Sequence, residues 1–219
     1  MLASNLTSRG IFPVRASYMG REVLNLMAEY HVRHLPVVTD NKLVGIITEE
    51  QILSQNKEES IGSYNINLVQ AQVKHNDHTY EIMKMMSEYG LTLVPVVDQN
   101  DDYAGVVTVY AILKHLTNAA SFAEPGGVIV LEMNKNHYSL EEIARIVESE
   151  NALILSTFVT SYPESTLIEV TLKLNTQKLS HIIATLNRFE YTIKASFVEH
   201  HYEEVLKDRY DSLIAYLNV

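Results

Sequence analysis

Residues Arg21–Val38 read REVLNLMAEYHVRHLPVV, and residues Tyr80–Val97 read YEIMKMMSEYGLTLVPVV. At an offset of 59 the two stretches align without a gap, and 7 of their 18 positions are identical. After one extra residue in the second copy the match resumes at an offset of 60, which places Thr48 over Thr108. A repeat of this kind is the strongest single guide to architecture, so the first half of the chain is one unit written twice.

Each copy predicts the same order of elements. The apolar residues of the two quoted stretches recur with the spacing of a helix that buries one face. Ser17 and Asn76, which are 59 residues apart, are the predicted N-caps of these helices. Two short strands follow, joined by a turn rich in Asp and Asn, and a second helix begins after each threonine. With a short strand before the first helix, around 11–14 and 68–73, the predicted unit is β-α-β-β-α.

The strings HLPVV and LVGIIT in the first copy, and LVPVV and AGVVT in the second, resemble the CBS motif. Two CBS motifs in tandem are called a Bateman module, in which the copies pack with pseudo-twofold symmetry and leave two clefts. In that family the clefts commonly bind AMP, ADP, ATP, S-adenosylmethionine or NAD. The resemblance implies an α/β (α+β) fold and a regulatory, nucleotide-binding protein rather than an enzyme.

The ligand signature of the CBS family opens the last helix of each motif. It consists of a Gly, two apolar residues, a Ser or Thr, two further residues and an Asp. The hydroxyl and the free N–H groups of the helix meet phosphate, and the carboxylate accepts hydrogen bonds from ribose. Thr48 and Thr108 keep the hydroxyl, but Gln51 and Ala111 replace the carboxylate. An amide bonds ribose without charge assistance, and alanine cannot bond it at all.

The first copy is therefore the predicted ligand site. By analogy with the family, this site consists of Val14, Arg33, His34, Thr48 and Gln51. A weaker second cleft is predicted around Thr108 and Lys74.

Two interpretations of these residues stay open. Thr48 and Gln51 have the spacing of a capping box, which satisfies two N–H groups of the helix without a ligand. The sequence weighs this structural role equally against a ligand-facing one. For Arg33 and His34 it slightly favours solvated residues at a strand edge over phosphate ligands.

The second half of the chain begins with a linker pattern. The stretch NAASFAEPGG, residues 118–127, is rich in small residues and ends in Pro-Gly-Gly. The pattern then changes to β-α-β-β-α-β over about 70 residues, which predicts a ferredoxin-like fold. The size and position of this part resemble an ACT domain. Ser139 and Glu142 predict a capping box for its first helix, and Asn175 a cap for its second.

ACT domains that bind amino acids usually carry a Gly in the turn after the first strand. This chain has Asn134–Tyr138 there, so pairing of sheets between subunits is favoured over amino-acid binding. A CBS pair followed by an ACT-like domain resembles the acetoin-utilisation regulators. In the tail, 201–219, apolar residues recur with helical spacing, which predicts an amphipathic helix that packs on the sheet or joins a partner subunit.

Composition excludes several classes of function. The 17 Lys and Arg residues stand against 27 Asp and Glu, a net charge of −10 that disfavours a nucleic-acid partner. No apolar run approaches the length of a membrane span, and with no cysteine there is no disulfide or thiolate chemistry. No catalytic residue and no metal site is predicted, because the histidine pairs lack further ligands at readable spacing.

The predicted domains are, in chain order, the first CBS motif, the second, a linker, the ACT-like domain and a terminal helix, at 1–60, 61–120, 121–126, 127–200 and 201–219. The expected protein is a cytoplasmic homodimer that senses an adenine nucleotide or a related adenosyl ligand, with no certain cofactor. The alternative is a scaffold for assembly whose clefts have lost their ligands.

Overall fold

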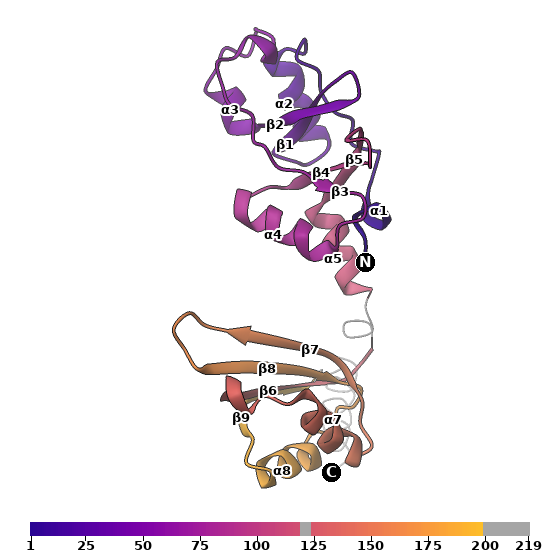
Figure 1. Ribbon diagram of the computed structural model, residues 1–219, viewed down its shortest axis with the longest axis vertical. Helices are drawn as coiled ribbons and strands as arrows, with labels where there is room; N and C mark the ends of the chain where they lie inside the picture. Colours follow the sequence, from indigo (N-terminus) through magenta and orange to yellow (C-terminus); the bar gives the residue numbers. More distant parts are fainter. Residues whose placement is uncertain (119–123, 199–219) are drawn as a thin grey trace, which may run out of the picture. The chain divides into compact units, whose positions relative to one another are not determined.

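The structure, a computed structural model, describes residues 1–118 and 124–198. The chain divides into two compact units, Met1–Leu116 and Thr117–Val219 (Figure 1). The predicted tail helix, and part of the predicted linker, lie outside the described residues. Among those that are described, no helix combines the length and apolar character needed to cross a membrane.

Unit 1 contains the two copies of the repeat. The first copy comprises α2 (Gly20–Glu29), β1 (His34–Thr39), β2 (Lys42–Thr48) and α3 (Glu49–Leu53). The second comprises β3 (Val73–Lys74), α4 (Thr79–Tyr89), β4 (Leu93–Val97), β5 (Tyr103–Thr108) and α5 (Val109–Thr117). A short helix, α1 (Ala3–Leu6), precedes the first copy, and a 3-10 turn, η1 (Ile61–Ser63), lies between the copies. The predicted order of helix, hairpin and helix is confirmed in both.

The first strand of each copy is shorter than predicted. In the first copy only Val14 pairs, through a parallel bridge to Val37. The equivalent pair in the second copy, Val73 and Val96, lies in the two-residue strand β3 beside β4. Pro13 has no N–H to donate, and its position next to Val14 limits how far the strand can extend.

A segment from each copy pairs with a strand of the other copy. Ser8, ahead of the first helix of copy one, pairs with Val106 in β5 through N–O contacts of 2.8 and 3.0 Å. Val69, ahead of the first helix of copy two, pairs with Ile46 in β2 through two contacts of 3.0 Å. The strand predicted at 68–73 is thus divided between two partners. Val69 pairs with the first copy, and Val73 pairs with β4 of the second copy.

Two equivalent glycines make this exchange possible. Gly45 has φ +155° and Gly105 has φ +142°, conformations that other residues rarely adopt. A Cβ at Gly45 would lie 2.7 Å from the Cβ of Leu68, and one at Gly105 would lie 2.6 Å from the carbonyl oxygen of Ser8. Both glycines are therefore required where the exchanged segments cross the hairpin.

The exchange also merges the cores of the two copies. Leu93 and Val106 of the second copy are buried in the apolar cluster of the first. Ile46 of the first copy is buried in the cluster of the second. Because burial of apolar area is the main stabilising contribution to a fold, neither copy has a complete core alone.

The predicted N-caps Ser17 and Asn76 are wrong by two residues in both copies. The helices begin after Met19 and His78. In the first copy the backbone around Ser17 is held by hydrogen bonds from the N–H groups of 61–62. N-terminal residues hold the matching segment of the second copy in the same way. These tertiary contacts keep both segments extended past the expected cap.

Unit 2 is a four-stranded antiparallel sheet with two helices on one face (Figure 1). Its elements are β6 (Gly127–Asn134), η2 (Lys135–His137), α7 (Leu140–Ser149), β7 (Ile154–Ser161), β8 (Leu167–Leu174), α8 (Ser180–Arg188) and β9 (Thr192–Val198). The strand order is β7-β8-β6-β9. This chain order and sheet order are consistent with the predicted ferredoxin-like arrangement.

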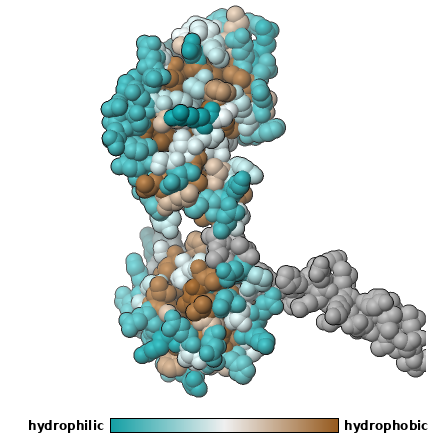
Figure 2. Space-filling view, turned by 90° about the vertical axis from the view of Figure 1, so that its right-hand side faces the viewer, coloured by the Kyte–Doolittle hydropathy of each residue, from teal (hydrophilic) through white to brown (hydrophobic). Residues whose placement is uncertain are grey.

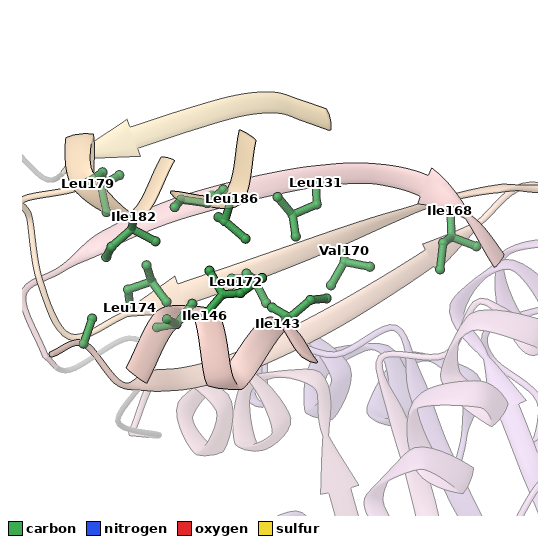
Figure 3. Close-up of a cluster of buried hydrophobic side chains, with 13 residues drawn as sticks. Leu131, Ile143, Ile146, Ile168, Val170, Leu172, Leu174, Leu179, Ile182 and Leu186 are labelled. Atoms are coloured by element: carbon green, nitrogen blue, oxygen red, sulfur yellow. The ribbon is translucent and has the colours of Figure 1, made fainter. Parts of the chain in front are cut away.

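The core of unit 2 lies between the sheet and its helices. Leu131 of β6, Leu172 of β8 and Ile143 of α7 point into this layer and are fully buried (Figure 3). The opposite face of the sheet carries a charged group, in which Lys194 contacts Glu132 and Glu169. Side-chain alternation along each strand produces this division. Apolar residues also gather on one exposed face of the unit (Figure 2).

One predicted cap in unit 2 is confirmed and one is wrong. The hydroxyl of Ser139 accepts a hydrogen bond from the Glu142 N–H at 3.3 Å, which confirms Ser139 as the N-cap and is one of the two bonds of the predicted capping box. Asn175 does not cap α8, which begins at Ser180. Its side-chain oxygen accepts instead from the N–H of Leu153 at 2.8 Å, because the end of β8 lies beside the start of β7.

Candidate functional site

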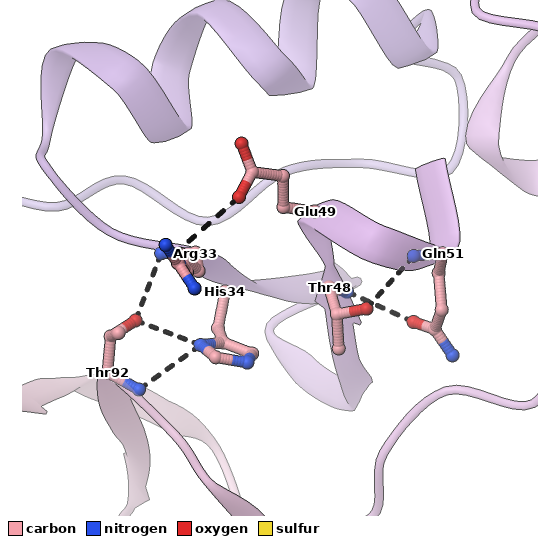
Figure 4. A network of polar contacts seen from close by, with 6 residues as sticks. All are labelled: Arg33, His34, Thr48, Glu49, Gln51 and Thr92. Carbon is pink, nitrogen blue, oxygen red and sulfur yellow. Dashed lines mark hydrogen bonds and ion pairs between the residues drawn. The ribbon is translucent and has the colours of Figure 1, made fainter. Parts of the chain in front are cut away.

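Thr48 is the N-cap of α3, and the capping box is complete. The N–H of Gln51 donates to the Thr48 hydroxyl at 3.1 Å, and the N–H of Thr48 donates to Gln51 Oε1 at 3.0 Å (Figure 4). These two bonds satisfy backbone donors that would otherwise lack partners at the helix end. The structural role is therefore established for both residues.

Gln51 also has its remaining amide group engaged. Its Nε2 donates to the carbonyl oxygen of Asn67 at 2.8 Å, in the segment that leads to the second copy. With Oε1 in the cap and Nε2 on Asn67, the side chain that replaces the family carboxylate already bonds protein at both ends. A ribose at this position would have to displace one of these bonds.

Arg33 lies on the surface, as the solvated interpretation expected. Its side chain is 78% exposed, and its Nε lies 3.8 Å from Glu49 Oε2 (Figure 4). An ion pair this exposed contributes little to stability, about 0–1 kcal/mol. The carboxylate of Glu49 nevertheless offsets the positive charge of Arg33, which a phosphate at this position would need.

His34 is not a solvated residue, and that interpretation is wrong. It is 8% exposed, and Nδ1 lies 3.1 Å from the N–H of Thr92 and 2.9 Å from the Thr92 hydroxyl (Figure 4). The Thr92 hydroxyl also accepts the N–H of Arg33 at 3.0 Å. In the sequence alignment Thr92 is the counterpart of Arg33, so this network joins the two copies where their equivalent strands meet.

The imidazole of His34 is neutral in this network, because Nδ1 can accept the Thr92 N–H only without a proton. Burial lowers the pKa of His34 below its ordinary value of 6.5, and the positive charge of Arg33 lowers it further, while Glu49 opposes the change. The unfolded chain thus takes up a proton at a pH where the folded chain does not.

Unit 1 is accordingly expected to lose stability as the pH falls below about 6.5, the ordinary pKa of histidine. Replacing His34 by Asn keeps an acceptor near the Nδ1 position and removes the titration, so this variant should show a flatter dependence of stability on pH. Urea unfolding between pH 7.5 and 5.5 measures the difference. The matched control is His31→Asn at an exposed histidine; an equal flattening there would contradict the assignment.

The second predicted cleft keeps fewer of the contacts that are present at the first. The hydroxyl of Thr108 accepts the N–H of Ala111 at 3.1 Å, which repeats one half of the capping box. Ala111 cannot return the second bond. Lys74 lies in β3, exposed, with its backbone N–H bonded to Asp77 Oδ2 at 2.8 Å. The structure therefore gives both predicted residues a local backbone role.

Two pockets of unit 1 lie beside the predicted first site rather than at its cap. One has a volume of about 250 Å³ and is mostly apolar, and its lining includes Val37, Ile47 and Leu68. A larger one, of about 910 Å³, is lined by residues 12–18 and 38–41 and by one residue of the second copy. Val14, predicted for the first site, is fully buried in its wall.

Of the residues that line these two pockets, Val14 alone belonged to the predicted first site. Ala16 and Thr39 line both pockets, and Arg15 brings a positive charge to the larger one. Tyr103 reaches that pocket from the second copy, because its N–H bonds the carbonyl oxygen of Asn41 at 2.8 Å. The Tyr103 hydroxyl is buried and has no hydrogen-bond partner among residues 1–118 and 124–198, and burial raises the pKa of this hydroxyl. Only the fold brings these segments together.

The CBS-domain family model matches residues 3–57 and 71–118 of this chain. Together with the repeat and the shared core, this match shows that residues 3–118 form a tandem CBS domain pair. No family model match confirms an ACT domain in the second unit.

Known proteins resemble the CBS pair over limited lengths. Hypoxic response protein 1 of Mycobacterium tuberculosis is 39% identical over 59 residues, covering 27% of this chain and 41% of that protein. A homoserine O-acetyltransferase of Methanococcus vannielii is 28% identical over 123 residues, covering 53% and 25%. The chain thus spans less than half the length of either relative.

A solved structure from Thermotoga maritima, described as a CBS domain pair/ACT domain protein, is also similar. Its TM-score is 0.49 at 22% sequence identity, and the match covers 54% of this chain and 98% of that one.

Proposed function

We propose that the CBS pair is a regulatory sensor whose ligand, an adenine nucleotide or a related adenosyl compound, binds in the first copy. The observation that carries this proposal is the pair of pockets that share Ala16 and Thr39. Volumes of about 250 and 910 Å³ are near the range in which small ligands bind, about 300–1,000 Å³.

The chemistry of the two pockets supports an adenosyl ligand. The smaller pocket offers an apolar slot suited to a base, and the larger one adds aromatic side chains, Tyr18 and Tyr103, and hydroxyl groups. Arg15 supplies the positive charge for a phosphate, a role that Arg33 meets less well because Glu49 lies against it. In this proposal Thr48 stays the cap of α3, next to the smaller pocket rather than in its lining.

The test is thermal shift and calorimetric titration of the whole chain with AMP, ADP, ATP, S-adenosylmethionine and NAD. A ligand at 100 times its dissociation constant should add about 2.7 kcal/mol to the free energy of unfolding. Thr39→Trp, at an exposed residue that lines both pockets, should fill them and abolish the response while leaving the fold intact.

A second variant separates phosphate recognition from base recognition. Arg15→Gln should weaken binding of ATP more than binding of adenosine, and Arg9→Gln is the matched control at another exposed arginine of the same segment. The proposal fails if none of the five ligands gives a response at millimolar concentration. It also fails if Thr39→Trp leaves a measured response unchanged.

The alternative is an assembly scaffold whose clefts no longer bind ligands. Two observations favour the scaffold. Both ends of the Gln51 amide already bond protein, and both copies lack the family carboxylate. A scaffold predicts the same oligomer by light scattering with and without nucleotide. Loss of a measured ligand response in Thr48→Ala, but not in Thr108→Ala, would refute it, since both variants lose the same kind of cap.

Unit 2 is proposed to be an ACT-like domain that serves regulation through assembly rather than catalysis. Its chain order and strand order support this assignment. A pocket of about 400 Å³ lies beside the turn after β6, but Glu132, Glu142 and Glu190 line it, and an amino-acid carboxylate would meet their repulsion. Sheet pairing is therefore the favoured use of this unit.

A further inference from the structure

An apolar groove lies between α7 and the start of β7. Its volume is about 450 Å³, and it is lined by Leu140, Ala144 and Glu148 of the helix and by residues 153–157. The three helix residues are spaced four apart in the sequence, so they form one stripe along α7. Leu140 is 44% exposed and Leu153 57%. Within the described part of the chain, this groove therefore leaves large apolar side chains open to solvent.

The groove exists because α7 and α8 cover only part of the sheet. The buried positions of the sheet come from β6 and β8, and among residues 124–198 only Ile154 of β7 packs against the buried cluster. α8 contacts α7 and β9, which places it toward the other edge of the sheet. The face of a sheet is stabilised by burial against another element. A third helix beside α7 would complete the cover over β7.

Residues 201–219 have the sequence pattern that such a helix needs. The apolar residues that recur there at helical spacing are Leu206, Tyr210, Leu213 and Leu217. On a helix this apolar stripe would be about 16 Å long, and the stripe of α7 that lines the groove is about 12 Å long. A single amphipathic helix of this length gains most of its stability from packing of its apolar face. The stripe and the groove are therefore matched in length and in chemistry.

The register of the sheet brings this segment to the end of the groove. Val198, at the end of β9, pairs with Gly127. Gly127 pairs with Leu174, which pairs with Ile154 at the start of β7. This row crosses three strand spacings, or about 14 Å. When extended, residues 199–205 can span about 23 Å, so the chain after β9 is long enough to reach the groove along this row.

The direction of entry agrees with the charges. α7 ends at Ser149 and β7 begins at Ile154, so Glu148 lies at the end of the groove where the chain arrives. A helix that enters there runs antiparallel to α7, with its positive N-terminal end toward the Glu148 carboxylate. Lys207 and Arg209 flank the beginning of the apolar stripe. Both side chains then come to the same end of the groove as Glu148.

We propose that residues 201–219 form an amphipathic helix that lies in the groove between α7 and β7 of its own chain, antiparallel to α7. The apolar stripe of this helix covers Leu140, Ala144 and Leu153. The proposal goes beyond the function proposed for the CBS pair. It depends neither on ligand binding by unit 1 nor on the assembly role of unit 2, so failure of either leaves it intact.

The first test uses the absence of cysteine from the chain. In the full chain, Ala144→Cys combined with Tyr210→Cys should form a disulfide within one molecule on mild oxidation, because both positions face the same contact. Mass spectrometry and a non-reducing gel detect this product. Ala144→Cys combined with Ser212→Cys is the matched control. Ser212 lies on the opposite side of the predicted helix, so this pair should give little product.

A second pair of variants checks the direction of the helix. Glu148→Cys combined with Leu206→Cys should give the same intramolecular product, because both positions lie at the entry to the groove. Glu148→Cys combined with Leu217→Cys should not, since an antiparallel helix carries Leu217 to the far end. The reverse result would overturn the antiparallel arrangement.

The third test measures whether the groove and the segment stabilise each other. Leu153→Ser and Leu213→Ser should each lower the melting temperature of unit 2 by about 4–8 °C, and the double variant should lose no more than the larger single loss. In an open groove Leu153→Ser would change little, because the side chain would already be exposed. Leu167→Ser, at an exposed leucine where β8 begins, is the control, and its loss should add in full to that of Leu213→Ser.

Three outcomes overturn the proposal. One is a disulfide of Ala144→Cys with Tyr210→Cys that joins two molecules, since the occupant of the groove would then be a second copy. Another is a yield from this pair no higher than that of the Ser212→Cys control. The third is a double variant of Leu153→Ser and Leu213→Ser in which the two losses add in full.

Discussion

Leu172→Ala is expected to lower the free energy of unfolding of unit 2 by about 3 kcal/mol, within the range of 2–5 kcal/mol for such core truncations. Leu172 is fully buried at the centre of β8, under both helices (Figure 3). Truncation removes apolar contacts and leaves a cavity that a sheet held on both sides cannot collapse to fill.

The control for this prediction is on the same strand. Leu167 is 45% exposed, so Leu167→Ala should cost about 1 kcal/mol or less. Urea unfolding followed by circular dichroism measures both variants. The core clusters of the two units share no residue, so the transition of unit 1 should keep its midpoint. A similar loss in both leucine variants would contradict the assigned core.

Gly105→Ala is expected to cost about 3 kcal/mol, the sum of backbone strain and overpacking at about 1–3 kcal/mol each. A methyl group here would meet the carbonyl oxygen of Ser8 at 2.6 Å, and φ is +142°. The obstacle is backbone, which cannot rotate away as a side chain can. Relief would require loss of the hydrogen bonds between Ser8 and Val106.

Gly90→Ala separates the two causes. Gly90 ends α4 with φ +62°, and a Cβ there would meet nothing within 4 Å. This variant should therefore show only the strain of a left-handed residue, about 1 kcal/mol. In thermal unfolding, Gly105→Ala should have a clearly lower melting temperature than Gly90→Ala. Equal losses would mean that the exchanged segment does not constrain this position.

The repeat predicted much of unit 1 because its signals are local. Helical spacing, the turn rich in Asp and Asn, and the threonine before each second helix all act within a few residues. The turn of the first hairpin illustrates this, since Asp40 and Asn41 take φ of 49° and 66° as a two-residue hairpin turn requires. The same holds for Ser139, which caps α7 as expected.

The errors share one physical origin. Ser17, Asn76 and Asn175 are all good capping residues in sequence, but hydrogen bonds to distant parts of the chain prevent the caps. The residues that flank Ser17 and Asn76 accept N–H groups of 61–62 and of 3–4, and Asn175 itself accepts the N–H of Leu153. Capping stabilises a helix by about 1 kcal/mol, so a few tertiary hydrogen bonds outweigh it. The strand predicted at 68–73 was divided for the same reason.

The ligand site shows the same limit. The threonines that begin α3 and α5 could be found from the repeat, since the motif is local. The engagement of Gln51 by Asn67 could not, because 16 residues separate them and no sequence pattern links the two. The sequence gives only a weak indication of Tyr103 as a pocket residue. It is an aromatic residue in the hairpin of the second copy, which corresponds to the hairpin of the first copy that contains Lys42.

The repeat alone predicts two equivalent β-α-β-β-α units in the first half of the chain, and the spacing of Thr48 and Gln51 predicts a cap. The exchange of segments between the copies, the burial of His34 against Thr92 and the pockets around Ala16 and Thr39 are visible in the folded protein and not in the residue pattern. The reason is that hydrophobic periodicity and turn chemistry act over a few residues. Burial, pocket shape and the partner of a polar group depend on residues that folding brings together.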